Sequence, residues 1–176
     1  MIETNRLSII EADEKYINLI IRIESHEENR YYLWIGTYDE HLDEINDPNH
    51  LLLVIKEKMS DNVVGYALVR LDKQSNIFEL RRIAITKKGV GYGKEAMIGL
   101  IRYAFEQTDT NRFWLDVYPT NYAGIKLYDK LGLHVDGVLR SNYKDENGYL
   151  DQIVYSLLKE EYDGWLDNIK RGATNK

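Results

Sequence analysis

The sequence predicts an α/β fold of the α+β kind, in which one mixed sheet is antiparallel first and parallel in its middle, with helices packed on it. Three strands follow one another closely at residues 51–56, 63–71 and 77–85. The polar turns between them are short, which predicts an antiparallel meander. A strand–helix–strand order follows, and this order brings two strands parallel. The 176 residues contain no repeat or Pro/Ser-rich linker, so residues 1–176 are predicted to form a single domain.

The N-terminal part supplies one strand and two helices. Residues 7–10 are predicted to form the first strand, and residues 14–23 a helix that Asp13 can cap. Residues 38–46 fit a second short helix, with its apolar face at Tyr38, Leu42 and Ile45. We assign the acidic side chains of this segment to the outer, solvated face of that helix: Asp39, Glu40, Asp43, Glu44 and Asp47.

The C-terminal part alternates helices and strands. Apolar residues recur at helical spacing over residues 91–107, which predicts one long amphipathic helix. Residues 113–118 are predicted to form a strand and residues 121–131 a helix. Residues 133–158 fit a hairpin that turns at Asn147-Gly148, a dipeptide typical of two-residue turns.

Several kinds of chemistry are excluded or unsupported. The chain contains no cysteine, which excludes disulfides, thiolate metal sites and a covalent acyl-cysteine intermediate. No G-x-S-x-G elbow occurs, so a serine hydrolase gains no support. The histidines lack the paired spacing of metal ligands, and we predict no metal site; they are His26, His41, His50 and His134.

Charge and hydropathy limit the partners. A formal net charge of −6 argues against nucleic-acid binding and favours a cationic partner, although many proteins are acidic for solubility alone. The longest apolar stretch, residues 16–23, is too short to cross a bilayer. The N-terminal residues lack the pattern of an export signal. We therefore expect a cytoplasmic protein that binds neither nucleic acid nor membrane.

The sharpest local feature is a glycine loop, Lys88-Gly89-Val90-Gly91-Tyr92-Gly93-Lys94, between a strand and a helix. Without side chains, successive N–H groups can converge on a phosphate oxygen, and the helix dipole adds positive charge. A dinucleotide-binding G-x-G-x-x-G would need glycine at Lys94, and a Walker loop would need glycine at Lys88 and a hydroxyl at Glu95. Both fail, which leaves an anion-binding loop of another kind or a turn that only permits close helix packing.

The loop resembles the pyrophosphate pattern Q/R-x-x-G-x-G/A of the GNAT superfamily of N-acetyltransferases, with Lys88 in the polar first place ahead of Gly91 and Gly93. The segment from Asn121 to Leu133 resembles the superfamily's N-x-x-A-x-x-L-Y-x-x-x-G-F. It departs at Ala123-Gly124, where Arg and Ala are common, and at Leu133, where Phe is usual.

The ends of the chain carry a finer resemblance. Thr4-Asn5-Arg6-Leu7 and the segment from Gly148 to Tyr162 look like the RimJ/RimL-type branch, which includes acetylases of ribosomal protein N-termini. The same layout resembles bacterial spermidine acetyltransferases.

This resemblance implies a fold, a cosubstrate and site residues. It implies a central, mostly antiparallel sheet that is splayed at a parallel strand pair and flanked by helices. It implies direct acetyl transfer from acetyl-CoA to a primary amine in a ternary complex, with the pyrophosphate held by the Lys88–Lys94 loop. A backbone N–H near Ile83 to Ile85 would meet the thioester carbonyl. Asn121 would bind the pantetheine arm, although a bare N-cap would look the same.

Acetyl transfer also needs a base and an acid. An alkyl amine has a pKa near ~10.4, so a base must remove its proton near neutral pH. The resemblance points to Glu79, because its strand lines the cleft in the family; a surface ion pair with Arg81 and Arg82 is the alternative. It points to Tyr128 as the acid that protonates the CoA thiolate, and the alternative is one more core tyrosine.

By the same resemblance, acceptors enter between residues 29–36 and residues 140–149. The aromatic run from Tyr31 to Trp34 could cradle a cation or fill a hydrophobic lid. Two rival functions remain: a non-catalytic acyl-CoA-binding sensor or interaction domain, and a phosphate-binding domain for another nucleotide. The sequence leaves the amine acceptor, the acyl chain beyond acetyl, and homodimer formation open.

Overall fold

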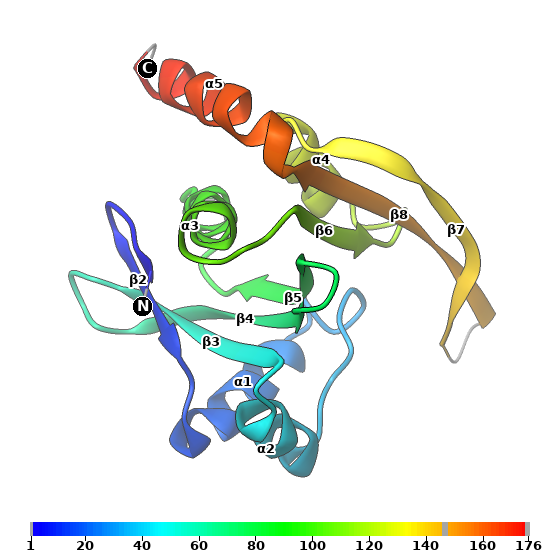
Figure 1. Cartoon of the computed structure of the whole chain (residues 1–176). Helices are drawn as coiled ribbons and strands as arrows, with labels where there is room; N and C mark the ends of the chain where they lie inside the picture. Colours follow the sequence, from blue (N-terminus) through cyan, green and yellow to red (C-terminus); the bar gives the residue numbers. More distant parts are fainter. Residues whose placement is uncertain (1, 146–147, 175–176) are drawn as a thin grey trace.

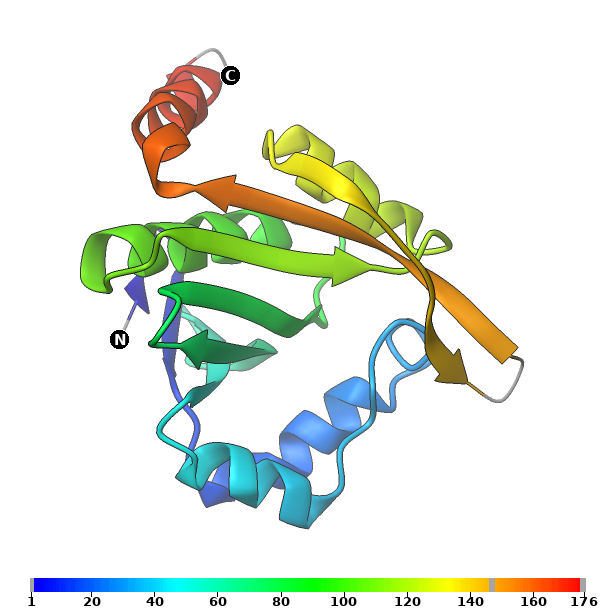
Figure 2. The same ribbon diagram turned by 45° about the vertical axis from the view of Figure 1, so that its right-hand side comes forward.

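The computed structural model describes residues 2–145 and 148–174. Within them the chain forms one mixed sheet of eight strands in the order β1-β2-β3-β4-β5-β6-β8-β7, with helices on both faces (Figures 1 and 2). The strands are β1 (Ile2–Glu3), β2 (Leu7–Glu11), β3 (His50–Glu57), β4 (Val63–Asp72), β5 (Ile77–Ile85), β6 (Arg112–Val117), β7 (His134–Asp145) and β8 (Gly148–Leu158). The helices are α1 (Ile17–Glu24), α2 (Tyr38–Asn46), α3 (Tyr92–Gln107), α4 (Tyr122–Lys130) and α5 (Tyr162–Thr174), with short 3₁₀ turns at Glu14–Tyr16 and Lys159–Glu161.

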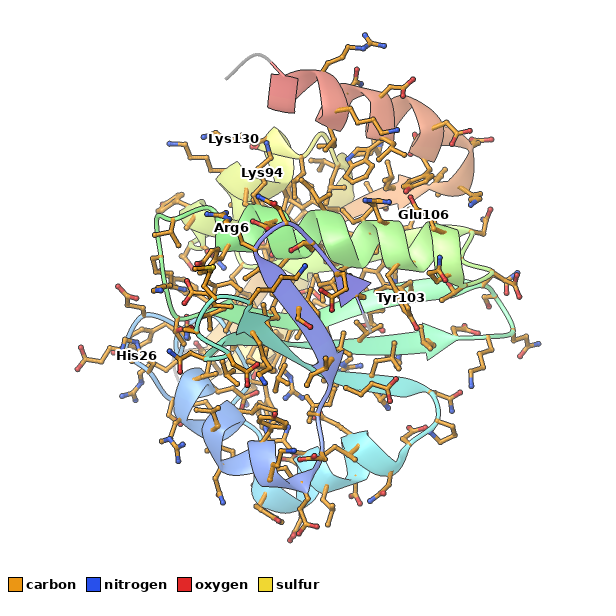
Figure 3. All side chains as sticks on the ribbon, turned by 90° about the vertical axis from the view of Figure 1, so that its left-hand side faces the viewer. Arg6, His26, Lys94, Tyr103, Glu106 and Lys130 are labelled. Atoms are coloured by element: carbon orange, nitrogen blue, oxygen red, sulfur yellow. The ribbon has the colours of Figure 1, made fainter. Side chains whose placement is uncertain are left out.

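The sheet separates two hydrophobic cores. Helix α3 covers one face, where Met97 and Leu100 pack against strand residues such as Phe78 and Phe113. Helices α1 and α2 lie on the other face (Figure 3). There, apolar residues of α1 join a smaller core with Leu68 and Ala84. Alternate residues of a strand point to opposite faces, so each central strand supplies both cores.

The sheet parts in its middle, as predicted. Strands β5 and β6 are its parallel pair, and they pair over a short register that ends at Glu79 and Trp114. Beyond it, β5 stays with β4 as far as Ile85, while β6 stays with β8 as far as Val117. Each strand is held on its outer side only, so a gap opens between them. The pairing of β5 with β4 also skips Arg81, an irregularity of the kind found next to active sites.

Most predicted elements are confirmed to within two residues. Helix α2 and strand β5 have the predicted bounds, and the predicted first helix begins as a 3₁₀ turn capped by Asp13. Strand β1 and helix α5 were not predicted. The predicted turn at Asn147-Gly148 falls partly outside the described residues, although β7 and β8 on either side do pair as a hairpin.

One prediction about α2 is wrong. The buried residue of this helix is His41, and Glu44 does not lie on a solvated outer face: it points inward and forms ion pairs with His41 and Arg82. Its partner Arg82 lies on β5, and the periodicity of the apolar residues alone does not reveal this pairing.

Candidate active site

The gap between β5 and β6 opens into a cavity of about 400 Å³, here called the acceptor cavity because residues of both predicted acceptor segments line it. Strands β5 and β6, the loop before α2 and the β7–β8 hairpin all contribute to its wall. Its charged lining residues are Glu40, Glu79, Arg81, Arg82 and Asp116, and its aromatic ones are Tyr32, Trp34, Tyr118, Tyr128 and Tyr143.

A second cavity of about 470 Å³ lies between the glycine loop and the start of α4, and it is here called the donor cavity because the predicted pyrophosphate loop lines it. Its lining includes five lysines: Lys87, Lys88, Lys94, Lys126 and Lys130. Ile83, Asn121 and Tyr128 line both cavities. The two spaces therefore meet at these three residues, with the positive charge on the donor side.

The predicted glycine loop forms the wall of the donor cavity. Gly91 caps α3 in the left-handed conformation, with φ 87°, which glycine adopts without strain. Every residue of the predicted loop lines the cavity except Val90. The 16-residue helix α3 begins there, so its free N–H groups and the lysines make a site suited to a phosphate anion.

Lys88 lines the donor cavity and bonds to a residue outside it. Its Nζ donates a 2.9 Å hydrogen bond to Oδ1 of Asn29, a buried residue of the loop that leads to α2. Burial lowers the pKa of Lys88 and outweighs the charge of Glu28, which raises it. The residue in the polar first place of the loop therefore also contacts the acceptor-side segment.

Asn121 caps α4, and the cap explains Gly124. Oδ1 of Asn121 accepts a 2.9 Å hydrogen bond from the Gly124 N–H. A Cβ on residue 124 would stand 3.1 Å from Cγ of Asn121, tighter than ordinary contact. Glycine thus permits the close approach of the cap, and Asn121 is an N-cap as well as a lining residue.

Tyr128 is buried at the point where the cavities meet, with its ring 5.5 Å from that of Tyr155. Burial raises its pKa well above the ordinary value, and the charge of Asp116 adds to this effect. The phenol therefore stays protonated near neutral pH. The alternative of a core tyrosine is compatible with its burial but does not account for its place in both cavity walls.

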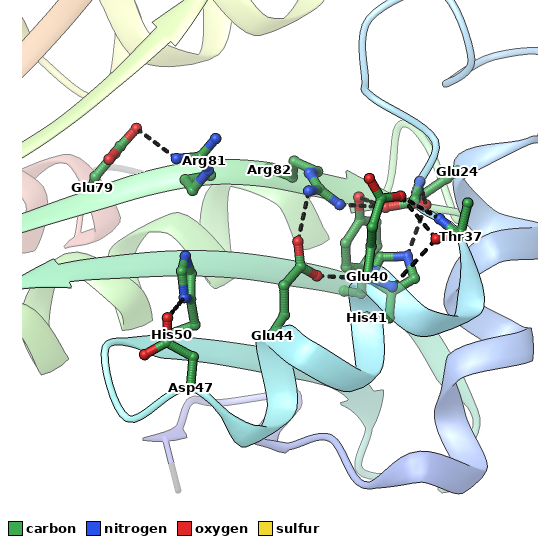
Figure 4. Close-up of polar contacts among 12 residues, drawn as sticks. Glu24, Thr37, Glu40, His41, Glu44, Asp47, His50, Glu79, Arg81 and Arg82 are labelled. Carbon is green, nitrogen blue, oxygen red and sulfur yellow. Dashed lines mark hydrogen bonds and ion pairs between the residues drawn. The ribbon is translucent and has the colours of Figure 1, made fainter.

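Glu79 points into the acceptor cavity and is nearly buried. Oε2 lies 2.7 Å from Nε of Arg70, an ion pair without the alignment of a hydrogen bond. Arg81 is more distant, at 3.8 Å, and Arg82 turns away to α1 and α2 (Figure 4). The ion-pair alternative is therefore confirmed in part: Glu79 pairs closely with Arg70 and more distantly with Arg81, whereas Arg82 is engaged elsewhere.

Asp116 is a lining carboxylate that sequence reasoning missed. It lies two residues after Trp114, the parallel partner of Glu79, so it faces the same side of the sheet as Glu79. Burial raises its pKa first and the charge of Glu79 second, while a hydrogen bond from Gln152 lowers it. The alternation of β6, with buried Phe113, Leu115 and Val117, is the signal that could have pointed to it.

A buried polar cluster supports the acceptor side of the sheet. Glu24, on α1, has no exposed surface and accepts four hydrogen bonds (Figure 4). They come from the Gly36 N–H (2.9 Å), His41 Nε2 (3.1 Å), Tyr66 OH (2.5 Å) and Arg82 Nη1 (3.2 Å). Burial alone would raise the pKa of Glu24, but the bonds from His41, Tyr66 and Gly36 lower it overall. The cluster ties α1, α2 and β5 together.

The two predicted acceptor segments contribute unequally. Tyr32, Leu33 and Trp34 line the acceptor cavity, and from the range 140–149 Tyr143 does so. Arg140 lines a separate depression on the hairpin. Tyr31 is 70% exposed and Trp34 is 52% exposed, so neither ring is packed in the hydrophobic core.

Among the described residues, no helix is long and apolar enough to cross a membrane. Among the same residues, no group of three or more His, Asp or Glu side chains is arranged to hold a metal ion.

The acetyltransferase (GNAT) family matches residues 14–133 of the chain. The chain belongs to this family. It is 32% identical over 121 residues to the N-acetyltransferase p20 of Bacillus licheniformis, an alignment that covers 66% of this chain and 65% of that protein. The chain thus spans less than two thirds of that relative's length.

A further relative and a solved structure of the same fold extend the comparison. The chain is 26% identical over 149 residues to the "Probable spermine N(1)-acetyltransferase" of Bacillus subtilis subsp. natto, covering 80% of this chain and 81% of that protein. A solved chimera of spermidine N-acetyltransferase SpeG from Vibrio cholerae and hSSAT shares the fold with a TM-score of 0.77. That structure is 18% identical and covers 90% of this chain and 98% of the other.

Proposed function

We propose that the chain is an acetyl-CoA-dependent N-acetyltransferase of the RimJ/RimL-like branch that transfers acetyl directly to a primary amine in a ternary complex. The observation that carries this proposal is the meeting of a lysine-lined cavity and a carboxylate-lined cavity at Tyr128. The donor's pyrophosphate binds the Lys88–Lys94 loop, and its thioester reaches the gap between β5 and β6.

The reaction requires the amine nitrogen to attack the thioester carbonyl while the C–S bond breaks. Glu79 or Asp116 takes the proton of the incoming ammonium, since both carboxylates face the acceptor cavity. The edge of β5 beyond Glu79 has no strand partner on the β6 side among the described residues. Its N–H groups near Ile83 to Ile85 are therefore available to the carbonyl oxygen as negative charge develops.

Tyr128 gives a proton to the departing CoA thiolate and regains one from the nitrogen, which loses its second proton as the amide forms. Burial raises the pKa of the phenol, which alone would make it a poorer acid. The same burial disfavours the thiolate anion leaving beside it, so both pKa values rise and the transfer is not opposed by the site.

The acceptor is proposed to be a cationic amine of the polyamine type. Three carboxylates, Glu40, Glu79 and Asp116, line the acceptor cavity together with Arg81 and Arg82. The charge of Arg82 is balanced by Glu24 and Glu44, and Arg70 and Arg81 pair with Glu79. Among the described residues, Glu40 and Asp116 are therefore the lining carboxylates without an arginine partner in an ion pair. The spermine acetyltransferase relative supports the same class.

The test is release of free CoA thiol from acetyl-CoA with polyamines, aminoglycosides, amino acids and peptide N-termini as acceptors. We expect turnover with the polyamines and weak or no turnover with anionic amino acids. Tight CoA binding without turnover on any amine would contradict the enzyme and leave a non-catalytic CoA-binding domain.

A further inference from the structure

The turn between β1 and β2 crosses α3 at its N-terminal end, where Arg6 lies near Lys94 (Figure 3). Arg6 Nη1 donates a 3.0 Å hydrogen bond to the carbonyl oxygen of Val90. Its Nε donates to Oε2 of Glu95 at 2.7 Å, and its backbone N–H donates to Oε1 at 2.6 Å. One residue outside the donor cavity is therefore bonded both to the glycine loop and to the first turn of the helix.

Further contacts are made by this turn (residues 4–6), here called the strap. The guanidinium lies over the ring of Tyr92, 4.7 Å from its centre. A Cβ on Gly91 would stand 3.3 Å from Nη2 of Arg6. The hydroxyl of Thr4 donates to Oε1 of Glu95 at 2.7 Å. The turn thus bonds to Val90 and packs on Tyr92, while Arg6 itself does not line the donor cavity.

Glu95 is the second partner of the strap and carries a negative charge in the first turn of α3. Burial raises its pKa, but the bonds from the Arg6 N–H, Thr4 and the Arg6 side chain lower it overall, so it is ionised. An unpaired carboxylate there would repel a phosphate at the same helix end. The ion pair with Arg6 at 2.7 Å compensates this charge.

We propose that Arg6 is a positioning residue for the donor: from outside the cavity, it holds the Val90–Tyr92 backbone in the conformation that binds the pyrophosphate of acetyl-CoA. This rests on the proposed function for the identity of the donor. A loop held in place before binding loses less conformational freedom when the anion arrives. Arginine is required because its fork bonds two acceptors at once, which the single ammonium of lysine does not reproduce.

The test compares two donors, acetyl-CoA and S-acetylpantetheine, which lacks the pyrophosphate. In Arg6→Gln we expect kcat/KM for acetyl-CoA to fall roughly tenfold or more, while kcat/KM for S-acetylpantetheine stays at the wild-type value. Arg6→Lys should behave like Arg6→Gln. The matched control is Arg102→Gln, because Arg102 is a half-exposed residue of α3 that pairs with Glu106 at 3.1 Å. This variant should keep the wild-type kcat/KM for both donors.

A double variant separates positioning from charge. In Arg6→Gln with Glu95→Gln, the negative charge is gone but the contact to the loop is still missing, so we expect CoA binding measured by calorimetry to remain weak. Wild-type affinity in the double variant would overturn positioning and leave only charge compensation. An equal fall for both donors in Arg6→Gln, or no fall, would also overturn it. A wild-type chain that binds no CoA would instead overturn the proposed donor, and this inference with it.

Discussion

Asp116 on β6 and Glu79 on β5 face the same cleft, where the two strands part. Burial is the largest cause of the raised pKa of Asp116, and the charge of Glu79 is the second. A carboxylate with a raised pKa is a stronger base when ionised, and it must lose its proton before it can act. Substitution of Asp116 and substitution of Glu79 should therefore have different effects on kcat/KM and on its pH dependence.

The first prediction uses this coupling. If Asp116 is the base, kcat/KM rises with pH as Asp116 ionises, and Asp116→Asn lowers kcat/KM by about 100-fold. Glu79→Gln removes the repelling charge, so the acidic limb of the pH profile should move to lower pH while activity persists. Loss of activity in Glu79→Gln, with an active Asp116→Asn, would assign the base to Glu79 alone.

The second prediction concerns Tyr128. Tyr128→Phe removes a proton donor needed only as the thiolate leaves, so turnover should fall by about 10- to 100-fold with little change in CoA binding. Tyr155→Phe is the matched control, since its hydroxyl bonds to Asp129 at 2.9 Å and it lines neither cavity. Wild-type kcat in Tyr128→Phe would show that this tyrosine is a core residue.

The third prediction concerns the glycine loop. A Cβ on Gly93 would stand 3.7 Å from Leu127, ordinary contact at the donor cavity. Gly93→Ala should therefore keep the fold and weaken CoA binding by roughly tenfold, because the added methyl group occupies space beside the loop backbone that is proposed to bind the pyrophosphate. Gly91 is a poorer test site, since its φ of 87° strains any side chain.

Gly164→Ala provides the control for the glycine test, because a Cβ there meets nothing within 4 Å. Its CoA affinity should equal that of the wild type. Unchanged CoA affinity in a folded Gly93→Ala protein would contradict the assignment of the loop.

The fourth prediction is a pH dependence of stability from His41. Burial lowers its pKa, but Glu24 and Glu44 outweigh burial and raise it from 6.5 to about 9. A group with a raised pKa stabilises the fold fully below its unfolded value and ceases to do so as pH rises through the folded value. As the pH rises from about 6.5 to 9, the midpoint temperature of thermal unfolding should therefore decrease. The free energy of unfolding should decrease by an amount on the order of 3 kcal/mol over the same range.

His41→Gln should remove this fall while lowering stability at neutral pH. His50→Gln is the control, because His50 pairs with Asp47 at 2.8 Å near the surface, and the fall should persist in it. A thermal midpoint that is constant from pH 6.5 to 9 in the wild type would contradict a charged His41.

The fifth prediction concerns the acceptor. The net charge of −6 and the carboxylates of the acceptor cavity raise the local concentration of a cationic amine. Since salt screens exposed charges within about 8 Å at physiological ionic strength, kcat/KM for a polyamine should drop as salt rises while kcat barely changes. A neutral amine that is acetylated best, without salt dependence, would contradict a cationic acceptor.

The sequence by itself determined the order of the elements, the meander and the glycine loop. These depend on local signals: alternation in strands, helical periodicity over residues 91–107, and glycines between a strand and a helix. It also led to Tyr128 and Asn121 through a resemblance, and the structure brings both to the wall between the two cavities.

The tertiary structure alone decided which charges meet. Asp116 reaches the cleft because β6 and β5 part after Trp114 and Glu79, and Glu44 turns inward because Arg82 lies on the facing strand. Arg6 reaches the loop from 84 residues away in sequence. Pairings over such separations depend on how the sheet is assembled, and no local periodicity encodes them.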